Sequence, residues 1–292
     1  MRRLLFTLLC LFTLSCPAHA DEKGADKPGE VSAAEVLVST PKYPPNMSYE
    51  PSLGVYEYRV SWQGIGAANV KVYVEKVDGE YHVTATARTN RYVDVFYKLR
   101  YRASGVLAAG MKPVKMEIDQ RENSKVKQDS VTFLPNGDIH SVRWKRGKLI
   151  SDEVFDPQNV TLEPFSAGFL ARSLPWELGQ TRHFDTFSGQ SRFLVSLTAE
   201  DRTEMKVNGE LRPVWVIVPK VIKLTAGDGK SKLRKARIYV TADERKEILL
   251  IKSDVFIGSV NTQLVSFTPL ADTTPGPQFA KLQDPNKVVI TR

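Results

Sequence analysis

The sequence predicts a mostly β protein, built as one large curved antiparallel sheet or open β-barrel with one or two short helices. Three observations indicate this fold. Apolar and polar residues alternate in many short segments, glycine-containing turn signals separate these segments, and helical patterns are few and short. Many short strands joined by turns are typical of barrels and sandwiches, and no internal repeat of roughly 20–50 residues indicates a solenoid or propeller.

The alternation has a period of two and is clearest in residues 56–62, 70–75, 114–119 and 193–197. Because successive side chains of a strand point to opposite faces, this pattern predicts strands with one buried face. Asp78-Gly79, Pro135-Asn136-Gly137 and Asn208-Gly209 predict turns, since glycine accepts the positive φ that tight turns need. Further strands are predicted at residues 82–87, 129–134, 138–145, 214–218, 237–241, 246–253 and 259–267.

Two segments carry helical patterns. Residues 92–99 predict about two turns with an apolar side. Residues 166–174 are the stronger candidate, with Ser166 expected to cap the helix and Phe169 and Leu170 on its apolar face. Pro175 is expected to end it.

The first 20 residues have the three parts of a secretory signal peptide. Arg2 and Arg3 precede an apolar run over residues 4–14, and Ala18-His19-Ala20 is a small-residue cleavage site. The run is shorter than the roughly 20 residues of a membrane-spanning helix, although a retained anchor is an alternative interpretation. We therefore expect export, to the bacterial periplasm. Anchoring as a lipoprotein acylated at Cys16 is a further alternative, which the residues before Cys16 fit poorly.

Composition divides the rest of the chain into three parts. Residues 21–50 are expected to form a flexible tether, because they are rich in charged residues, glycine and proline and poor in bulky apolar groups. Residues 51–270 form the predicted antiparallel β domain, and residues 271–292 a polar tail. Both cysteines, Cys10 and Cys16, lie in the signal peptide, so the mature chain is expected to hold no disulfide and no cysteine nucleophile.

No sequence pattern indicates a metal site, a cofactor or a catalytic group. His82, His140 and His183 lie far apart, without the spacing of metal ligands. His183 with Asp185 and Ser188 is interpreted as a strand face followed by a turn rather than as a catalytic triad. The dispersed acids Glu153, Asp156 and Glu163 leave a hydrolase of envelope polysaccharide as one alternative, since a glycosidase needs two facing carboxylates.

The chain has a formal net charge of +8. The plainer interpretation of this charge is a solvated basic surface. If the charge serves binding in an exported protein, the expected partner is a lipid surface or an acidic envelope component rather than nucleic acid, and peripheral membrane contact is a further expectation. Lys230, Lys232 and Arg234 would share one face of a strand and suit an anionic headgroup. The plainer interpretation of this row is a solvated hairpin kept soluble by its charges.

The order of several motifs resembles the DUF3108 family of exported bacterial proteins over about residues 52–268. The resemblance lies in an opening strand with Tyr58, Val60 and Trp62, the turn glycines Gly64 and Gly66, an acidic loop into a helix (Asp156, Phe169, Leu170, Arg172), Leu178-Gly179-Gln180, a polar step (Ala242, Asp243, Arg245) and Gly258. The family has no established activity, so the resemblance implies a fold and a compartment. It is similar, more loosely, to the half-open β-barrels of periplasmic lipoprotein carriers. Ile238 and Tyr239 stand where the family would carry a tryptophan-like anchor, and no functional residue is transferred.

We therefore predict a periplasmic, non-enzymatic binding or carrier protein for a lipid or other amphiphile. Phe169, Leu170 and Trp176 would line the concavity, with Lys230, Lys232 and Arg234 at its rim. The alternative is a structural or interaction protein of the envelope that binds glycans or partner proteins. A carrier needs an unfilled apolar cavity inside the sheet, whereas a scaffold would fill that space with its own core.

Overall fold

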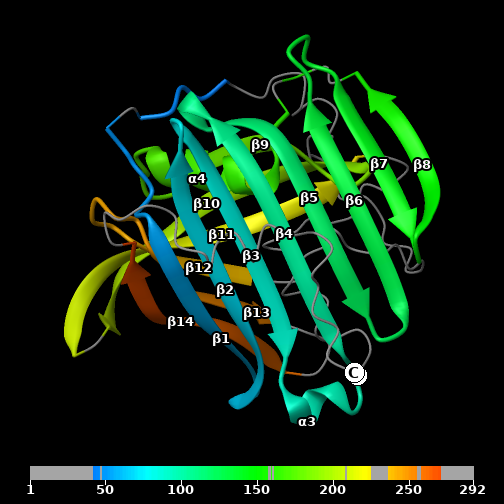
Figure 1. Ribbon diagram of the computed structural model, residues 1–292. Helices are drawn as coiled ribbons and strands as arrows, with labels where there is room; N and C mark the ends of the chain where they lie inside the picture. Colours follow the sequence, from blue (N-terminus) through cyan, green and yellow to red (C-terminus); the bar gives the residue numbers. More distant parts are fainter. Residues whose placement is uncertain are drawn as a thin grey trace, which may run out of the picture.

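A computed structural model describes residues 42–46, 48–156, 159, 161–207, 209–224, 236–254 and 258–270 (Figure 1). The predicted signal peptide, most of the predicted tether, the polar tail, and the basic residues Lys230, Lys232 and Arg234 lie outside these described residues.

The fold is mostly β, as the sequence predicts, and consists of one antiparallel sheet of fourteen strands. The strands are β1 (Gly54–Trp62), β2 (Ile65–Val77), β3 (Glu80–Thr89), β4 (Leu99–Ala108), β5 (Lys112–Glu122), β6 (Lys125–Phe133), β7 (Ile139–Lys145), β8 (Lys148–Phe155), β9 (Thr181–Ser188), β10 (Ser191–Val207), β11 (Glu210–Lys223), β12 (Ala236–Thr241), β13 (Ile248–Asp254) and β14 (Ser259–Pro269).

The strand order is β8-β7-β6-β5-β4-β3-β2-β1-β14-β13-β12-β11-β10-β9, so two meanders meet where β1 pairs with β14. The outer strands β8 and β9 do not pair with each other, and the sheet stays open. It curls nonetheless, so that β10 and β11 pass behind β2–β5 in Figure 1. Side chains bridge the opening: the rings of Phe155 and Phe187 lie 4.9 Å apart, and the Ser141 hydroxyl donates to the Gly189 carbonyl.

The predicted hairpins at Asp78-Gly79 and Pro135-Asn136-Gly137 are confirmed. Asp78 and Gly79 have φ of 50° and 85° between β2 and β3, and Gly137 has φ of 99° between β6 and β7. Glycine suits such positions because it has no Cβ to clash with the backbone. The third predicted turn includes Asn208, which lies outside the described residues.

The helical segments are shorter than predicted or begin elsewhere. In place of a helix over residues 92–99, α3 covers Arg91–Asp94, because Tyr97 and Leu99 turn into the core and β4 begins at Leu99. A short 3₁₀ turn, η1 (Ala109–Met111), follows β4.

The main helix, α4 (Pro164–Ser173), is capped by Glu163, so the prediction of Ser166 as the cap is wrong. The Glu163 carboxylate accepts the backbone N–H groups of Phe165 at 2.8 Å and Ser166 at 2.5 Å. Pro164 suits the first helical position because its missing N–H would have no partner there. Ser166 is instead the third helical residue and is buried.

Helix α4 lies inside the curl of the sheet and packs against both of its halves (Figure 1). Phe165 and Phe169 join the large core cluster, whose other members come mainly from β1–β7, with Phe187 of β9 and Val260 of β14. Leu170 and Leu174 join a second cluster with Phe184 of β9. The two clusters meet at the helix, which therefore packs between the two halves of the open sheet.

Glu163 is expected to make stability depend on pH. Burial raises the pKa of its carboxyl from 4.5 to about 7. The folded state therefore holds this proton more tightly than the unfolded state. The contribution of the Glu163 carboxyl to the free energy of unfolding falls as pH rises from about 4.5 to about 7, and it is constant above that range. Urea unfolding across this pH range should show a smaller loss of unfolding free energy for Glu163→Gln than for the unmodified protein. The glutamine does not titrate but keeps an oxygen acceptor at the cap. An unchanged slope in this variant would contradict the assignment.

Candidate ligand-binding cavity

The site begins with one face of α4 that the core does not cover. Most of the helix is buried, but Gly168 at its middle is exposed. A Cβ built on Gly168 would meet no atom within 4 Å. Glycine inside a helix costs about 0.5–1 kcal/mol relative to alanine, so its presence beside open space is unfavourable for folding alone.

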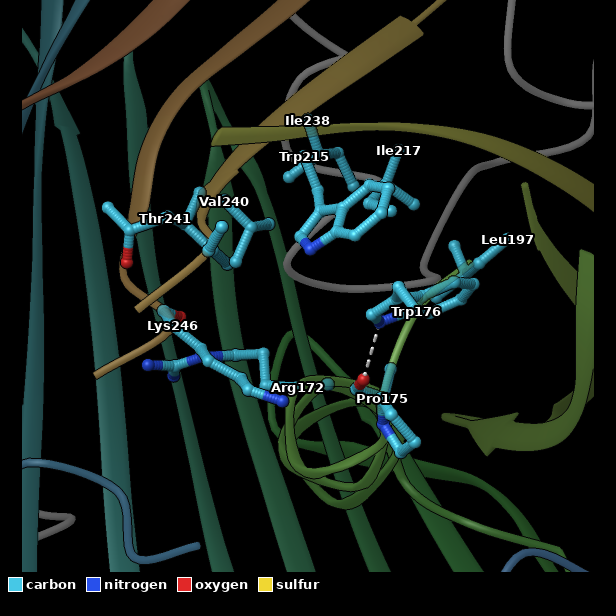
Figure 2. Close-up of a pocket in the computed structure, with 14 residues that line it drawn as sticks. Arg172, Pro175, Trp176, Leu197, Trp215, Ile217, Ile238, Val240, Thr241 and Lys246 are labelled. Atoms are coloured by element: carbon cyan, nitrogen blue, oxygen red, sulfur yellow. Dashed lines mark hydrogen bonds between the residues drawn. The ribbon is translucent and has the colours of Figure 1, made fainter. Parts of the chain in front are cut away.

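A cavity of about 230 Å³ opens beside this face, between the C-terminal half of α4 and strands β10–β13 (Figure 2). Its walls are mostly aromatic and branched aliphatic side chains. The lining residues are Gly168, Ala171, Arg172, Pro175, Trp176, Leu197, Trp215, Ile217, Ile238, Val240, Thr241, Ala242, Lys246 and Ile248. For scale, an engineered cavity of about 150 Å³ holds benzene.

A second cavity of about 110 Å³ lies on the other side of the same helix face, against β1–β3. Tyr56, Tyr58 and Phe169 are among its lining residues. Gly168, Arg172 and Ile248 border both cavities. The apolar space inside the sheet therefore continues along α4 on both sides of Gly168.

The lining of the larger cavity contains two charged side chains, Arg172 and Lys246, and both are cations. Backbone oxygens hold them in place: Arg172 Nε donates to the Lys246 carbonyl at 2.6 Å, and Lys246 Nζ to the Leu174 carbonyl at 3.0 Å. Burial and the nearby charges of Arg172 and Arg182 lower the pKa of the Lys246 ammonium. An anion bound beside Lys246 would relieve this repulsion.

Trp176 forms a fixed wall of the larger cavity. Its indole Nε1 donates to the Ala171 carbonyl at 3.0 Å, the dashed line in Figure 2. The Arg182 guanidinium lies 5.2 Å from the centre of its ring and donates to the Pro175 carbonyl. These contacts preorganise the indole, which lowers the entropy cost of binding against it.

The residues predicted to contact a ligand occupy different places. Trp176 lines the larger cavity and Phe169 the smaller one. Leu170 packs into the cluster between α4 and β9 rather than at either cavity. Lys230, Lys232 and Arg234 lie outside the described residues. Phe169 is also a core residue, so placing a charge there would test folding more than binding.

His183, Asp185 and Ser188 do not form a catalytic arrangement. His183 Nδ1 lies 2.8 Å from the Ser196 hydroxyl, whereas Asp185 pairs with Arg192. In the described residues, no cluster of histidines and carboxylates is placed to hold a metal ion. No helix among these residues has the length and apolar character to cross a membrane.

Sequence reasoning missed Gly168, Lys246, and the position of Arg172 in the cavity lining. Gly168 could have been found from the sequence, because a glycine inside a helical pattern is unfavourable and usually has a packing or functional reason. Lys246 has no such signal in the sequence, because its approach to α4 depends on a contact between residues 72 positions apart in the chain.

These features define an open, barrel-like β protein with an internal apolar cavity. The family model "Protein of unknown function (DUF3108)" matches residues 57–265, and the chain belongs to this family. The solved β-barrel-like protein of domain of unknown function DUF1849 from Brucella abortus has a similar fold, with a TM-score of 0.55 and 9% identity. The similarity covers 77% of this chain and 100% of that chain. No curated protein matches the sequence.

The open space beside Gly168 gives a stability prediction. Gly168→Ala should raise the free energy of unfolding by about 0.5–1 kcal/mol, because the methyl meets no atom and alanine favours the helix. Urea unfolding measures this change. Gly179→Ala is the matched control: its Cβ would also meet open space, but its φ of 78° should make the substitution destabilising.

Proposed function

We propose that this protein is a non-enzymatic binding or carrier protein for an anionic amphiphile, such as a fatty acid or a lipid with a phosphate headgroup. The observation that carries the proposal is the lining of the larger cavity: apolar walls with two cations and no carboxylate among its residues. Apolar walls with a few polar groups are typical of small-molecule sites. We place this activity in the bacterial periplasm.

The chemistry of the two ends of the cavity supports one orientation of the ligand. In the view of Figure 2, Trp215 and Ile238 lie on the side of the cavity opposite Arg172 and Lys246. An acyl chain would pack against Trp215 and Ile238, where each buried methylene contributes about 0.8 kcal/mol of binding free energy, and its headgroup would face the cations. The cavity beside Phe169 would extend the path for a longer chain.

A scaffold protein would fill this space with its own side chains, and a larger residue at position 168 would be enough to do so. A leucine at position 168 would enter the open space without an initial clash at Cβ. The unfilled space therefore favours a ligand-binding role over the alternative of an envelope scaffold. The hydrolase alternative needs two facing carboxylates, but Glu163 is buried as the cap of α4, whereas Glu153 is exposed on β8.

Fluorescence titration of the full chain with a fluorescent fatty acid and its uncharged methyl ester tests the proposal. Gly168→Leu should abolish binding of both probes without lowering the melting temperature, because it fills the cavity. Lys246→Met should weaken the fatty acid about tenfold or more, through loss of a charged hydrogen bond, and leave the ester unchanged.

Lys206→Met is the matched control, since it removes an exposed lysine of β10 that does not line the cavity. It should bind both probes as the unmodified protein does. The proposal is wrong if the unmodified protein binds neither probe, or if Gly168→Leu retains full affinity.

A further inference from the structure

The loop that contains α3 exposes large apolar side chains at one end of the sheet. The exposed fractions are 85% for Tyr92, 77% for Val95 and 71% for Phe96. Figure 1 shows α3 beyond the end of β3 and β4, away from α4. Ile65, at the start of neighbouring β2, is 71% exposed. Clusters of this kind on a protein surface mark interaction sites.

Hydrogen bonds attach the α3 loop to the neighbouring strands, so its apolar side chains are exposed in an ordered loop rather than in a frayed one. The backbone N–H of Asn90 donates to the Ala67 carbonyl at 2.9 Å. Asn123 accepts from the Lys98 N–H at 2.9 Å and donates its own N–H to the Lys98 carbonyl at 2.8 Å. Asp94 pairs with Arg100 of β4. These polar contacts fix the backbone of the loop and keep its apolar side chains exposed.

A row of arginines crosses the adjoining outer face of the sheet. Arg59 on β1 is opposite Asn69, Asn69 opposite Arg88, Arg88 opposite Arg100, and Arg100 opposite Arg121. The alternate residues of these strands are buried against the core, so the row lies on the outer face. Like charges directly opposite each other on neighbouring strands are destabilising.

One carboxylate, Asp94, offsets the charge of Arg100. In the described part of the chain, no ion pair joins Arg59, Arg88 or Arg121 to a carboxylate. Arg91 and Lys98, within the α3 loop itself, are exposed cations. The region therefore combines a protruding apolar tip with uncompensated positive charge.

We propose that this end of the sheet docks on the surface of an anionic lipid bilayer. Tyr92, Val95 and Phe96 would enter the interface between headgroups and acyl chains, and the arginine row with Arg91 and Lys98 would contact lipid phosphates. An amphipathic element with aromatic residues and flanking cations is the chemistry of interfacial binding. An acidic polysaccharide would contact the cations but would leave the apolar tip of Tyr92, Val95 and Phe96 in water.

Flotation of the full chain with phosphatidylcholine vesicles, with and without phosphatidylglycerol, tests the proposal. The unmodified protein should float with the anionic vesicles, and less so as salt rises. Phe96→Asp should abolish flotation. Arg59→Gln with Arg88→Gln should lower the partition coefficient about 30-fold, at about fivefold for each charge. All substituted side chains are exposed, and unchanged melting temperatures confirm folding.

The matched controls are Leu211→Asp, which alters another exposed apolar residue, and Lys112→Gln with Lys206→Gln, which removes two exposed charges elsewhere. Both should float as the unmodified protein does. Equal losses in test and control variants would overturn the assignment of this surface. Absence of flotation of the unmodified protein would also overturn it. The same holds if soluble heparin or DNA displaces the protein from the vesicles and binds Phe96→Asp as strongly as the unmodified protein. This test is independent of the cavity, since Gly168→Leu should float normally.

Discussion

The structure depends on keeping helix α4 inside the curl of a single open sheet. The helix contributes to both core clusters, to one through Phe169 and to the other through Leu170. Its N-terminus is buried, so the backbone N–H groups there need an acceptor that water cannot supply. Glu163 supplies it, and burial raises the pKa of this carboxyl. The helix thereby separates the sheet's halves and leaves space along its Gly168 face.

Side chains, rather than a β-ladder, hold the opening of the sheet together. A Cβ on Gly189 would lie 2.7 Å from the Arg143 guanidinium and 3.0 Å from the Asp129 carboxylate, so the turn after β9 packs closely against β6 and β7. Asp129 is fully buried and pairs with Arg143 and Lys127. The ion pair of Asp129 with Arg143 joins β6 to β7 on one side of the opening, and removing one partner would leave an uncompensated buried charge beside the turn at Gly189.

The sequence predicted the fold class well because alternation and turn glycines are local signals. It did not predict β4 or β8. All but one of the residues of β8 that precede Phe155 are exposed, so the strand has no period-two burial pattern. The full lining of the predicted cavity was beyond sequence reasoning for a different reason: Trp176, Trp215 and Lys246 come from separate parts of the chain and meet only through the strand order. Trp176 was identified as a candidate by its type, whereas Leu170 belongs to the packing between α4 and β9.

The cavity and the α3 loop lie at opposite ends of the sheet. Lys246 precedes β13, whose other end, Asp254, pairs with Ser259 beside the β1–β2 turn. The seven residues of β13 span about 20 Å. A protein docked through Tyr92 and Phe96 would therefore hold its apolar cavity about this distance above the lipid surface. Such an orientation favours presenting a ligand to a soluble or opposing partner over extracting one from the docked bilayer. Under these two proposals the sites would serve separate steps, and docking would fix where the cavity points.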